Sequence, residues 1–566
     1  MCNKIKMRGT DVTMESKEIE KLLIDLINIP SITGSDDENN CARFIYDWLN
    51  KLDYFKNNPK GLFFYKTPVE CETNRTLYSV AAFMRAKDIT ANTIILIGHF
   101  DVVDVECYAE IKSYAFDPLK LKNKYSKKHL SAEAYEDLKS GKYLFGRGSM
   151  DMKCGLAVEM SLLSDFSYDR TLFNSNILFL ALADEEANAS GMRGMIPFLN
   201  ELKEKEKLKY CVAVNTEPSD AAMPGIDKQV IFTGTIGKLL PAFYFVGKEA
   251  HVGNYYKGVS ASLMMAELVS LVEAEPSLSD EAFGECYPSW INLESRLIKK
   301  GYSVTVPNKA VAYFNCFTVT KTPNDVLKEM QKFAQNACKN CEIKLLNSYK
   351  SLKNRGYEGE QVENQSFTVI TYAEVYKIAK SKYYGDFDKY IDENININED
   401  KDLREKCLDL LEKILDISEL SGPLVVVGFL PPYLPHRTTM AKNTKNTKIM
   451  SAVEEIMCTT EDKFNEKAIV ANYFTGLCDL SYTGFEGNIS DLIVLSENFP
   501  GWGKLFSIDV EGILALDNIP IINIGPKGKD AHKNTERVEI EYSIKIFPKI
   551  LLKSINIIEK YCEIKK

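Results

Sequence analysis

The stretch that decides the fold is NILFLALADEEANASG, residues 176–191. An uninterrupted apolar run follows Asn176, and three adjacent carboxylates, Asp184, Glu185 and Glu186, come directly after it. A short continuous apolar run is typical of a strand that is buried on both faces. Like charges placed together repel one another unless a cation neutralises them. The stretch therefore predicts a buried strand with an acidic end that faces a cation.

Three further runs have the same character, and helical segments separate them. They are TIILIG (93–98), YCVAVN (210–215) and IPIINIG (519–525). Helical periodicity is clear in SKEIEKLLIDLINI (16–29) and CARFIYDWLNKL (41–52). Buried strands spaced by helices predict an α/β fold, with a mixed, largely parallel sheet flanked by helices.

The order of strand-like and helical segments changes between residues 235 and 345, approximately. KLLPAFYFVG (238–247) is followed by a helical segment (260–276), two strand-like runs within YSVTVPNKAVAYFNCFTV (302–319), a helix that ends at Cys341, and EIKLLNSY (342–349). The order βαββαβ predicts a smaller α+β domain inserted into the larger one.

We therefore expect three segments: 1–234 as the first part of a catalytic domain, 235–438 as a lid or dimerisation domain, and 439–566 as the second catalytic part. An insertion at about 350–422 contains two predicted helices, within 366–384 and 402–417, and its sequence does not assign it to either domain. PLVVVGF (423–429) is a candidate strand to close the small domain.

Composition excludes several classes of protein. The 566 residues carry a net charge of −9 with a pI near 5.5, which argues against a protein that binds nucleic acid or anionic lipid mainly through electrostatic attraction. We find no secretory signal and no apolar stretch long enough to span a membrane, and we expect a cytoplasmic protein with a small-molecule or short-peptide substrate. Cys338 and Cys341 form a single C-x-x-C pair, which favours two ordinary cysteines over a metal or redox site.

Residues that suit a metal follow each buried run. They are His99 and Asp101 after the first, Glu185 and Glu186 after the second, Glu217 after the third, His532 after the last, and Asp151 in the glycine-rich loop LFGRGSMDMKCG (144–155). Open α/β sheets place their chemistry beyond the carboxyl ends of the strands, so these groups would converge. Mixed nitrogen and oxygen donors suit Zn²⁺, with Mn²⁺ or Co²⁺ as substitutes.

Each residue taken alone has a simpler explanation. A His-x-Asp at a strand end is more often a hydrogen-bonded turn, and an acidic cluster is usually a solvated loop or a helix N-terminus. Asp151 could cap a helix, Glu217 could begin a turn, and His532 could lie on the surface. Their joint placement after successive buried strands favours the metal site.

The motifs together resemble the dinuclear zinc aminoacylase and carboxypeptidase family of peptidase clan MH, which includes acetylornithine deacetylase, succinyl-diaminopimelate desuccinylase and peptidase T. The matching strings are GHFDVVD (98–104), GRGSMDMKCG (146–155), DEEANASG (184–191), NTEPSD (215–220), GKEAHVG (247–253) and GPKGKDAHKNTE (525–536). They occur in the family's order and with its long interruption before the last histidine.

The resemblance implies a role for each matching residue. Asp151 would bridge two divalent ions, most often Zn²⁺, with His99 and Glu217 on one ion and Glu186 and His532 on the other. Asp101 would orient the first histidine and Glu185 would act as general base. His251 would be the lid histidine that reaches an active site, often that of a partner subunit in a homodimer. The peptide bond after Asp151 is expected to be cis.

Departures from the family pattern bear on the substrate. Where the family often has a lid asparagine and arginine that hold a substrate carboxylate, this chain offers Val304 and Phe317. The length and the 350–422 insertion look most like the arginine-utilisation (RocB) branch. We therefore expect a metal-dependent hydrolase of an N-acyl amino acid or small peptide, with an arginine-related compound favoured. The alternative is a non-catalytic metal-binding regulatory or scaffold protein on the same fold.

Overall fold

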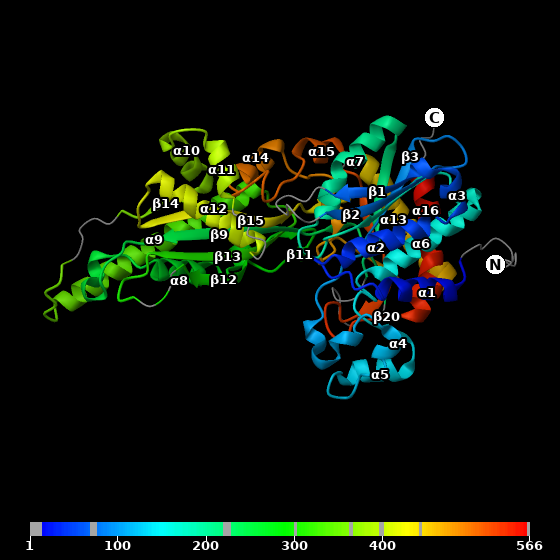
Figure 1. Cartoon of the computed structure of the whole chain (residues 1–566), viewed down its shortest axis with the longest axis horizontal. Helices are drawn as coiled ribbons and strands as arrows, with labels where there is room; N and C mark the ends of the chain where they lie inside the picture. The colour runs from blue at the N-terminus through cyan, green and yellow to red at the C-terminus, as the bar shows by residue number, and fades with distance from the viewer. Residues whose placement is uncertain are drawn as a thin grey trace.

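A computed structural model describes residues 14–67, 76–218, 228–298, 301, 303–360, 366–395, 401–440 and 444–562. The beginning of the chain, where we looked for a secretory signal, lies outside these ranges. Figure 1 shows two main regions side by side, one around a large sheet and one around a smaller sheet, with a third, small group of elements beside the large one.

The large sheet has eight strands in the order β1-β2-β5-β3-β6-β18-β7-β17. Their bounds are β1 Leu62–Thr67, β2 Leu77–Met84, β3 Asn92–His99, β5 Asn176–Leu182, β6 Lys209–Asn215, β7 Gln229–Phe232, β17 Ala468–Ala471 and β18 Ile521–Asn523. β3 runs parallel to β5 on one side and to β6 on the other, and β18 runs parallel to β6. The predicted α/β class and the four buried runs are confirmed.

Helices cover both faces of this sheet. One face carries α1 (Ser16–Ile27), α2 (Asp37–Leu49), α6 (Lys153–Tyr168), α13 (Thr444–Phe464) and α16 (Phe547–Cys562); the other carries α7 (Ser190–Glu206) and α15 (Val510–Ala515). Because side chains alternate along a strand, Ile94 and Leu96 of β3 pack in the core under the first group of helices. Ile95 and Ile97 pack in the core on the opposite face of the sheet. β3 is therefore buried on both sides, as its continuous apolar sequence requires.

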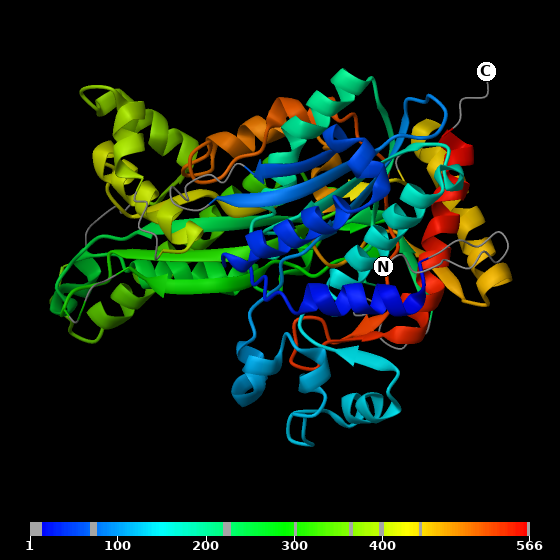
Figure 2. The same ribbon diagram turned by 45° about the vertical axis from the view of Figure 1, so that its right-hand side comes forward.

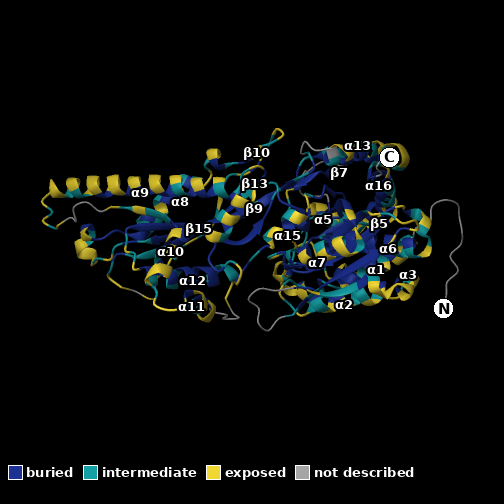
Figure 3. Ribbon diagram, turned by 90° about the horizontal axis from the view of Figure 1, so that it is seen from above, coloured by how far each residue is buried: buried dark blue, intermediate teal, exposed yellow. Residues whose placement is uncertain are grey.

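The small sheet has five strands in the order β12-β13-β9-β15-β14. Their bounds are β9 Gly237–Val246, β12 Ile291–Leu297, β13 Lys309–Thr318, β14 Thr368–Thr371 and β15 Leu424–Leu434. β15 contains the predicted closing strand and pairs with β9. Helices α8 (Ala261–Val272) and α9 (Pro323–Lys353) pack together against the sheet, and their outer faces are exposed (Figure 3).

Two predicted strands of the small domain are wrong. Residues 342–349 continue the 31-residue helix α9, because Cys338, Cys341 and Leu345 keep its buried stripe at helical spacing and no glycine or proline interrupts it. In the described part of the first run, residues 303–308, the only pairing is an isolated bridge between Thr305 and His251. The second strand of the pair is β12 instead. β12 has an alternating pattern of exposed and partly buried residues, which the search for continuous apolar runs did not detect.

The insertion joins the small region. It contains β14, α10 (Tyr372–Lys382), α11 (Phe387–Asn394) and α12 (Leu403–Ser418), and β14 pairs in parallel with β15. The chain crosses between the two regions where β8 (Gly234–Thr235) pairs with β16 (Arg437–Thr438). Beyond this crossing, α14 (Ile489–Glu497) also packs on the small region, where the N–H of Phe429 donates to the Asn498 carbonyl at 2.8 Å.

The third group of elements was not anticipated from the sequence. It contains α4 (Pro118–Leu121), α5 (Ala132–Ser140) and a three-stranded sheet of β4 (Tyr143–Phe145), β19 (Gly528–Lys529) and β20 (Arg537–Glu539). Figure 2 shows it as a separate group below the large sheet. Since β19 and β20 flank His532 in sequence, this small sheet holds the loop that carries the last predicted ligand.

Other sequence expectations can also be compared with the structure. Every cysteine among the described residues is free, and Cys338 and Cys341 are buried side chains of α9. The described helices include none with the length and apolar composition needed to cross a membrane.

Candidate metal centre

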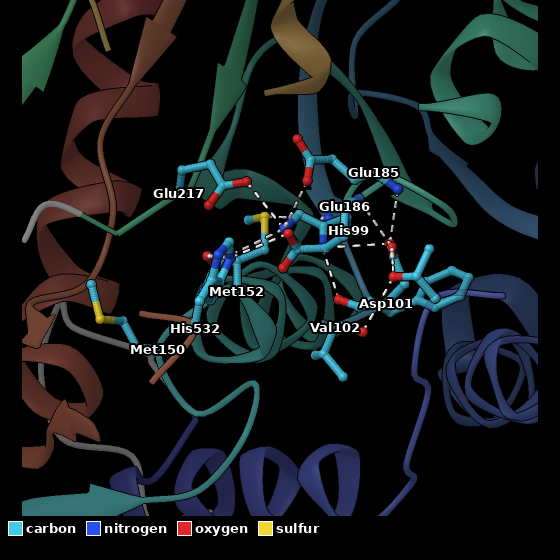
Figure 4. A network of polar contacts seen from close by, with 12 residues as sticks. His99, Asp101, Val102, Met150, Met152, Glu185, Glu186, Glu217 and His532 are labelled. Atoms are coloured by element: carbon cyan, nitrogen blue, oxygen red, sulfur yellow. Dashed lines mark hydrogen bonds and ion pairs between the residues drawn. The ribbon is translucent and has the colours of Figure 1, made fainter. Parts of the chain in front are cut away.

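The candidate centre lies at the carboxyl ends of three neighbouring strands. His99 is the last residue of β3, Glu185 and Glu186 follow β5, and Glu217 follows β6. Because β5, β3 and β6 are adjacent and parallel, their ends bring these side chains to one edge of the sheet (Figure 4). The convergence inferred from the sequence is present in the structure.

His99 faces three carboxylates through one ring nitrogen. Its Nε2 lies 3.2 Å from Oδ1 of Asp151, 3.2 Å from Oε1 of Glu217 and 3.7 Å from Oε2 of Glu185. The imidazole is almost fully buried. Burial alone would lower the pKa of His99, but the charges of Glu217 and Glu185 and the hydrogen bonds of Asp101 and Asp151 raise it well above its usual value.

His532 completes the other side of the cluster. Its Nε2 lies 3.1 Å from Oδ2 of Asp151 and 3.2 Å from Oε2 of Glu186. Hydrogen bonds to these two carboxylates raise the pKa of His532 to about 11. Asp151 therefore lies between the two imidazoles, with one carboxylate oxygen toward each of them.

Asp151 is carried to this position by a tight loop before α6. The Asp151–Met152 peptide bond is cis, as the resemblance implied. Gly155 in the first turn of α6 allows the helix to approach the end of β6 closely, because a Cβ at this position would lie 2.4 Å from the carbonyl oxygen of Thr216.

Asp101 contacts both the loop after β5 and the His99 side chain. Its carboxylate accepts the backbone N–H groups of Glu185 and Glu186 at 3.0 and 3.1 Å and the Thr33 hydroxyl at 2.8 Å. The Nδ1 of His99 lies 3.0 Å from the Asp101 carbonyl oxygen and 3.5 Å from its carboxylate. The backbone carbonyl is thus the closer partner of the ring, and the carboxylate mainly fixes the two glutamates.

The donor set fits two divalent cations. One group of mutually close ligand atoms comes from His99, Glu185 and Glu217, and another comes from His99, Asp151 and Glu186. Within the described part of the chain, Oε1 of Glu186 is buried and has no hydrogen-bond partner. Burial raises the pKa of Glu217 to about 7, and the charge of Asp151 adds to this effect. Carboxylates crowded in this way are stabilised by cations, and a histidine must be deprotonated to bind one.

A buried ion pair behind the centre was not singled out from the sequence. Arg147 Nη1 lies 2.5 Å from Oε2 of Glu536, and both side chains are about 1% exposed. Oε1 of Glu536 accepts the N–H groups of Met150 and Asp151, while Nη2 of Arg147 donates to the His532 carbonyl at 3.0 Å. The pair therefore holds both the Asp151 loop and the His532 loop. Both residues lie inside the quoted motifs, and this was the available signal.

Asp479 is a second residue that the sequence did not single out. Its carboxylate is buried, and its Oδ1 has no hydrogen-bond partner among the described residues. Burial, together with the charges of Asp101, Glu217 and Asp184, raises the pKa of Asp479 well above its usual value, although His99 opposes the shift. The only earlier signal was the loose likeness of GLCDLSY (476–482) to a family motif.

His251 is not part of this cluster within one chain. β9 begins near the crossing between the regions and ends at Val246, and His251 lies in the loop beyond that end. A ten-residue strand spans roughly 30 Å, so the small sheet separates this loop from the metal centre. The His251 side chain is exposed, and its Nδ1 accepts the Gly253 N–H. Val304 lies beside this loop, whereas Phe317 lies at the near end of the sheet, opposite Lys238.

Known proteins resemble the chain in sequence and in fold. A model of Peptidase family M20/M25/M40 matches residues 95–556. Protein RocB of Bacillus subtilis (strain 168) is 29% identical over 548 residues, covering 96% of each chain. The uncharacterized protein YqjN of the same strain is 30% identical over 550 residues, covering 96% of this chain and 97% of YqjN. In fold, an M20 family metallo-carboxypeptidase, Sso-CP2 from Sulfolobus solfataricus, has a TM-score of 0.53 at 13% identity, covering 96% of this chain and 99% of that one.

Proposed function

Because the chain belongs to peptidase family M20/M25/M40, we propose that its strand-end cluster binds two divalent metal ions and hydrolyses an amide or peptide bond of an N-acyl amino acid or a small peptide. Family membership makes the chain a hydrolase of the metallopeptidase and amidohydrolase type, in agreement with the resemblance found in its motifs. The observation that carries the proposal is the position of Asp151, which presents one oxygen to the side of His99 and the other to the side of His532.

The ligands divide into two sets around this shared carboxylate. His99 and Glu217 would complete the shell of one ion, and Glu186 and His532 that of the other. The distances of 3.1 and 3.2 Å from the imidazoles to these carboxylates support the division. Zn²⁺ is the ion that we favour for such mixed nitrogen and oxygen donors, with Mn²⁺ or Co²⁺ as alternatives.

Glu185 is the residue that we assign as general base. When bound, the two ions would supply Lewis acidity and lower the pKa of water at the site. Glu185 lies beside His99, and burial raises the pKa of its carboxyl group well above the usual value. It would accept the proton of the attacking water and deliver it to the leaving amine. Asp101 would keep Glu185 in place through the hydrogen bond to its backbone.

We further propose a homodimer in which His251 of the partner subunit approaches the centre and donates a hydrogen bond to the developing oxyanion. The distance between the His251 loop and its own centre supports this arrangement, because His251 of one chain does not reach the centre of the same chain. The edge strand β12 offers a surface for pairing, since Ile291, Leu293 and Leu297 are 41%, 51% and 40% exposed.

The three segments would then have separate tasks. Residues 1–234 and 439–566 would form the catalytic domain, and 235–438 the lid, to which the insertion contributes β14 and α12. The chain is 29% identical to Protein RocB along nearly its whole length. Because the resemblance found in the sequence is to the arginine-utilisation branch, we propose an arginine-related amide as the substrate. We place the protein in the cytoplasm, as its sequence indicated.

The test combines metal analysis with a substrate panel. Protein purified without chelator should contain close to two metal ions per chain and release free amine from at least one of a set of N-acyl amino acids and dipeptides. Glu185→Gln should keep both ions and lower kcat by about 10²–10⁴-fold, because it removes only the proton transfer.

Glu204→Gln, an exposed substitution on α7, is the matched control and should behave like the wild type. A wild-type protein that binds no metal when zinc is supplied would contradict the proposal. Two bound ions without turnover of any compound in the panel would favour the regulatory or scaffold alternative.

A further inference from the structure

Two cysteines, Cys211 and Cys562, meet at the edge of the large sheet opposite to the metal centre. Cys211 is the third residue of β6, whose other end leads to Glu217, and Cys562 is the last residue of α16. Both belong to the same buried core and are 3% and 7% exposed. The Asn92 side chain at the start of β3 donates to the Cys562 carbonyl at 3.4 Å. The end of α16 is therefore fixed beside the amino ends of the central strands.

The two thiols line one cavity of about 220 Å³. Its other described lining residues are Lys209, Lys445, Lys448, Ile449 and Tyr561. Lys445 and Lys448 belong to the first two turns of α13. The Asp517 carboxylate, 4.0 Å from Nζ of Lys445, is not among the lining groups. The described lining thus contains three ammonium groups and no carboxylate, which favours an anionic molecule.

The two thiols interact with each other and differ in acidity. A hydrogen bond from Cys562 lowers the pKa of Cys211, although burial opposes this effect. The positive charges of Lys209 and Lys445 lower the pKa of Cys211 further, and its Sγ lies 3.6 Å from the Lys209 carbonyl oxygen. The hydrogen bond between the thiols raises the pKa of Cys562. Cys211 is therefore the sulfur that more readily becomes a thiolate, and Cys562 is the one that keeps its proton.

The C-x-x-C pair of the small region is a contrast to these two thiols. Cys338 and Cys341 lie one turn apart on α9, and burial raises the pKa of each thiol to about 12. A thiol with a raised pKa is rarely deprotonated near neutral pH and reacts slowly with disulfides. The pair that the sequence pattern picks out is therefore the less reactive one.

We propose that Cys211 and Cys562 form a reversible disulfide by exchange with a small disulfide that carries carboxylates and enters the lysine-lined cavity. The Cys211 thiolate attacks one sulfur of this molecule, forms a mixed disulfide and releases the other half as a thiolate. Cys562 then gives up its proton and attacks Sγ of Cys211, which forms the protein disulfide and releases the second half. Two electrons pass from the protein to the small disulfide, which leaves as two thiols. The bond would join β6 to the last turn of α16.

The test compares disulfides of different charge on the reduced protein in its native state. Glutathione disulfide is anionic, 2-hydroxyethyl disulfide is uncharged, and cystamine is cationic. Peptide mapping after acid quenching and alkylation measures which cysteines have reacted. We expect glutathione disulfide to form the Cys211–Cys562 bond about 10-fold faster than cystamine does, with the uncharged reagent between them. Dithiothreitol should remove the bond.

Substitutions test the order of the two steps and the role of the lysines. Cys562→Ser should stop at a mixed disulfide between Cys211 and glutathione, and Cys211→Ser should leave Cys562 reduced. Lys448→Gln should slow the glutathione reaction by about threefold, because it removes one positive charge from the cavity. Lys60→Gln, an exposed substitution before β1, is the matched control and should react like the wild type.

Three outcomes would overturn the proposal. They are Cys211 and Cys562 that stay reduced while the exposed Cys458 reacts, a wild-type protein that stops at the mixed disulfide, and equal rates with glutathione disulfide and cystamine. All three are measured on the wild type, so they decide the matter even if a serine variant does not fold. The thermal midpoint of each variant shows whether it is folded.

Discussion

The two sheets of this protein differ in how directly their sequences reveal them. In the large sheet, β3, β5 and β6 are covered on both faces, and residues of the candidate metal centre lie at the end of β3 and directly after β5 and β6. In the small sheet, β12 is an exposed edge with an alternating pattern, and α9 continues through residues that resemble a strand. Full burial imposes a continuous apolar sequence, whereas partial burial permits several patterns. The comparison teaches that residues at the ends of central, fully buried strands are easier to identify from the sequence than residues at an exposed edge or at the crossing between the two regions.

The first prediction tests whether the small sheet has a core of its own. Phe314 of β13 is fully buried and packs edge-on against Phe243, with ring centroids 5.8 Å apart. Phe314→Ala should lower the free energy of unfolding by about 3–5 kcal/mol, because it removes a large buried ring and leaves a cavity. Denaturant unfolding measures the loss. Metal content should stay at the wild-type level, and a loss of metal would show that the two regions are energetically inseparable.

The second prediction concerns the crossing between the regions. Burial lowers the pKa of His436 from 6.5 to about 4, and its Nδ1 lies 3.2 Å from the Thr318 hydroxyl. Since the folded state holds this imidazole neutral, the unfolded chain binds the proton more readily below pH 6.5. The neutral His436 side chain therefore contributes fully to the free energy of unfolding above pH 6.5. Up to about 3 kcal/mol of this contribution is lost as the pH falls toward 4.

His436→Gln should therefore make the free energy of unfolding less dependent on pH between 6.5 and 4. Urea unfolding of the wild type and the variant over this range gives the difference directly. Parallel pH profiles for the two proteins would show that the imidazole is already solvated in the fold.

The third prediction tests the support behind the metal centre. Arg147→Lys keeps a positive charge near Glu536, but an ammonium group cannot span both Glu536 and the His532 carbonyl. We expect metal affinity to fall by about 10–100-fold, as is usual when the groups that orient ligands are changed. Competition with a chelator measures it. Arg85→Lys, at an exposed pair with Glu206, is the control and should leave the affinity unchanged.

The sequence by itself determined the α/β class, the four buried runs and the residues that follow them. It could do so because a strand buried on both faces tolerates few polar residues, and the ends of parallel strands meet at one edge. His99, Asp101, Glu185, Glu186, Glu217 and His532 were found in this way and Asp151 from its glycine-rich loop, and the structure brings these residues together.

Only the tertiary structure decided the rest. The Arg147–Glu536 pair joins residues 389 positions apart, and no local pattern identifies such a partner. Local sequence specifies backbone preference and burial, but the pairing of charges depends on which surfaces the fold places in contact. For this reason the residues that converge at the strand ends could be predicted from the sequence, and the buried pair behind them could not.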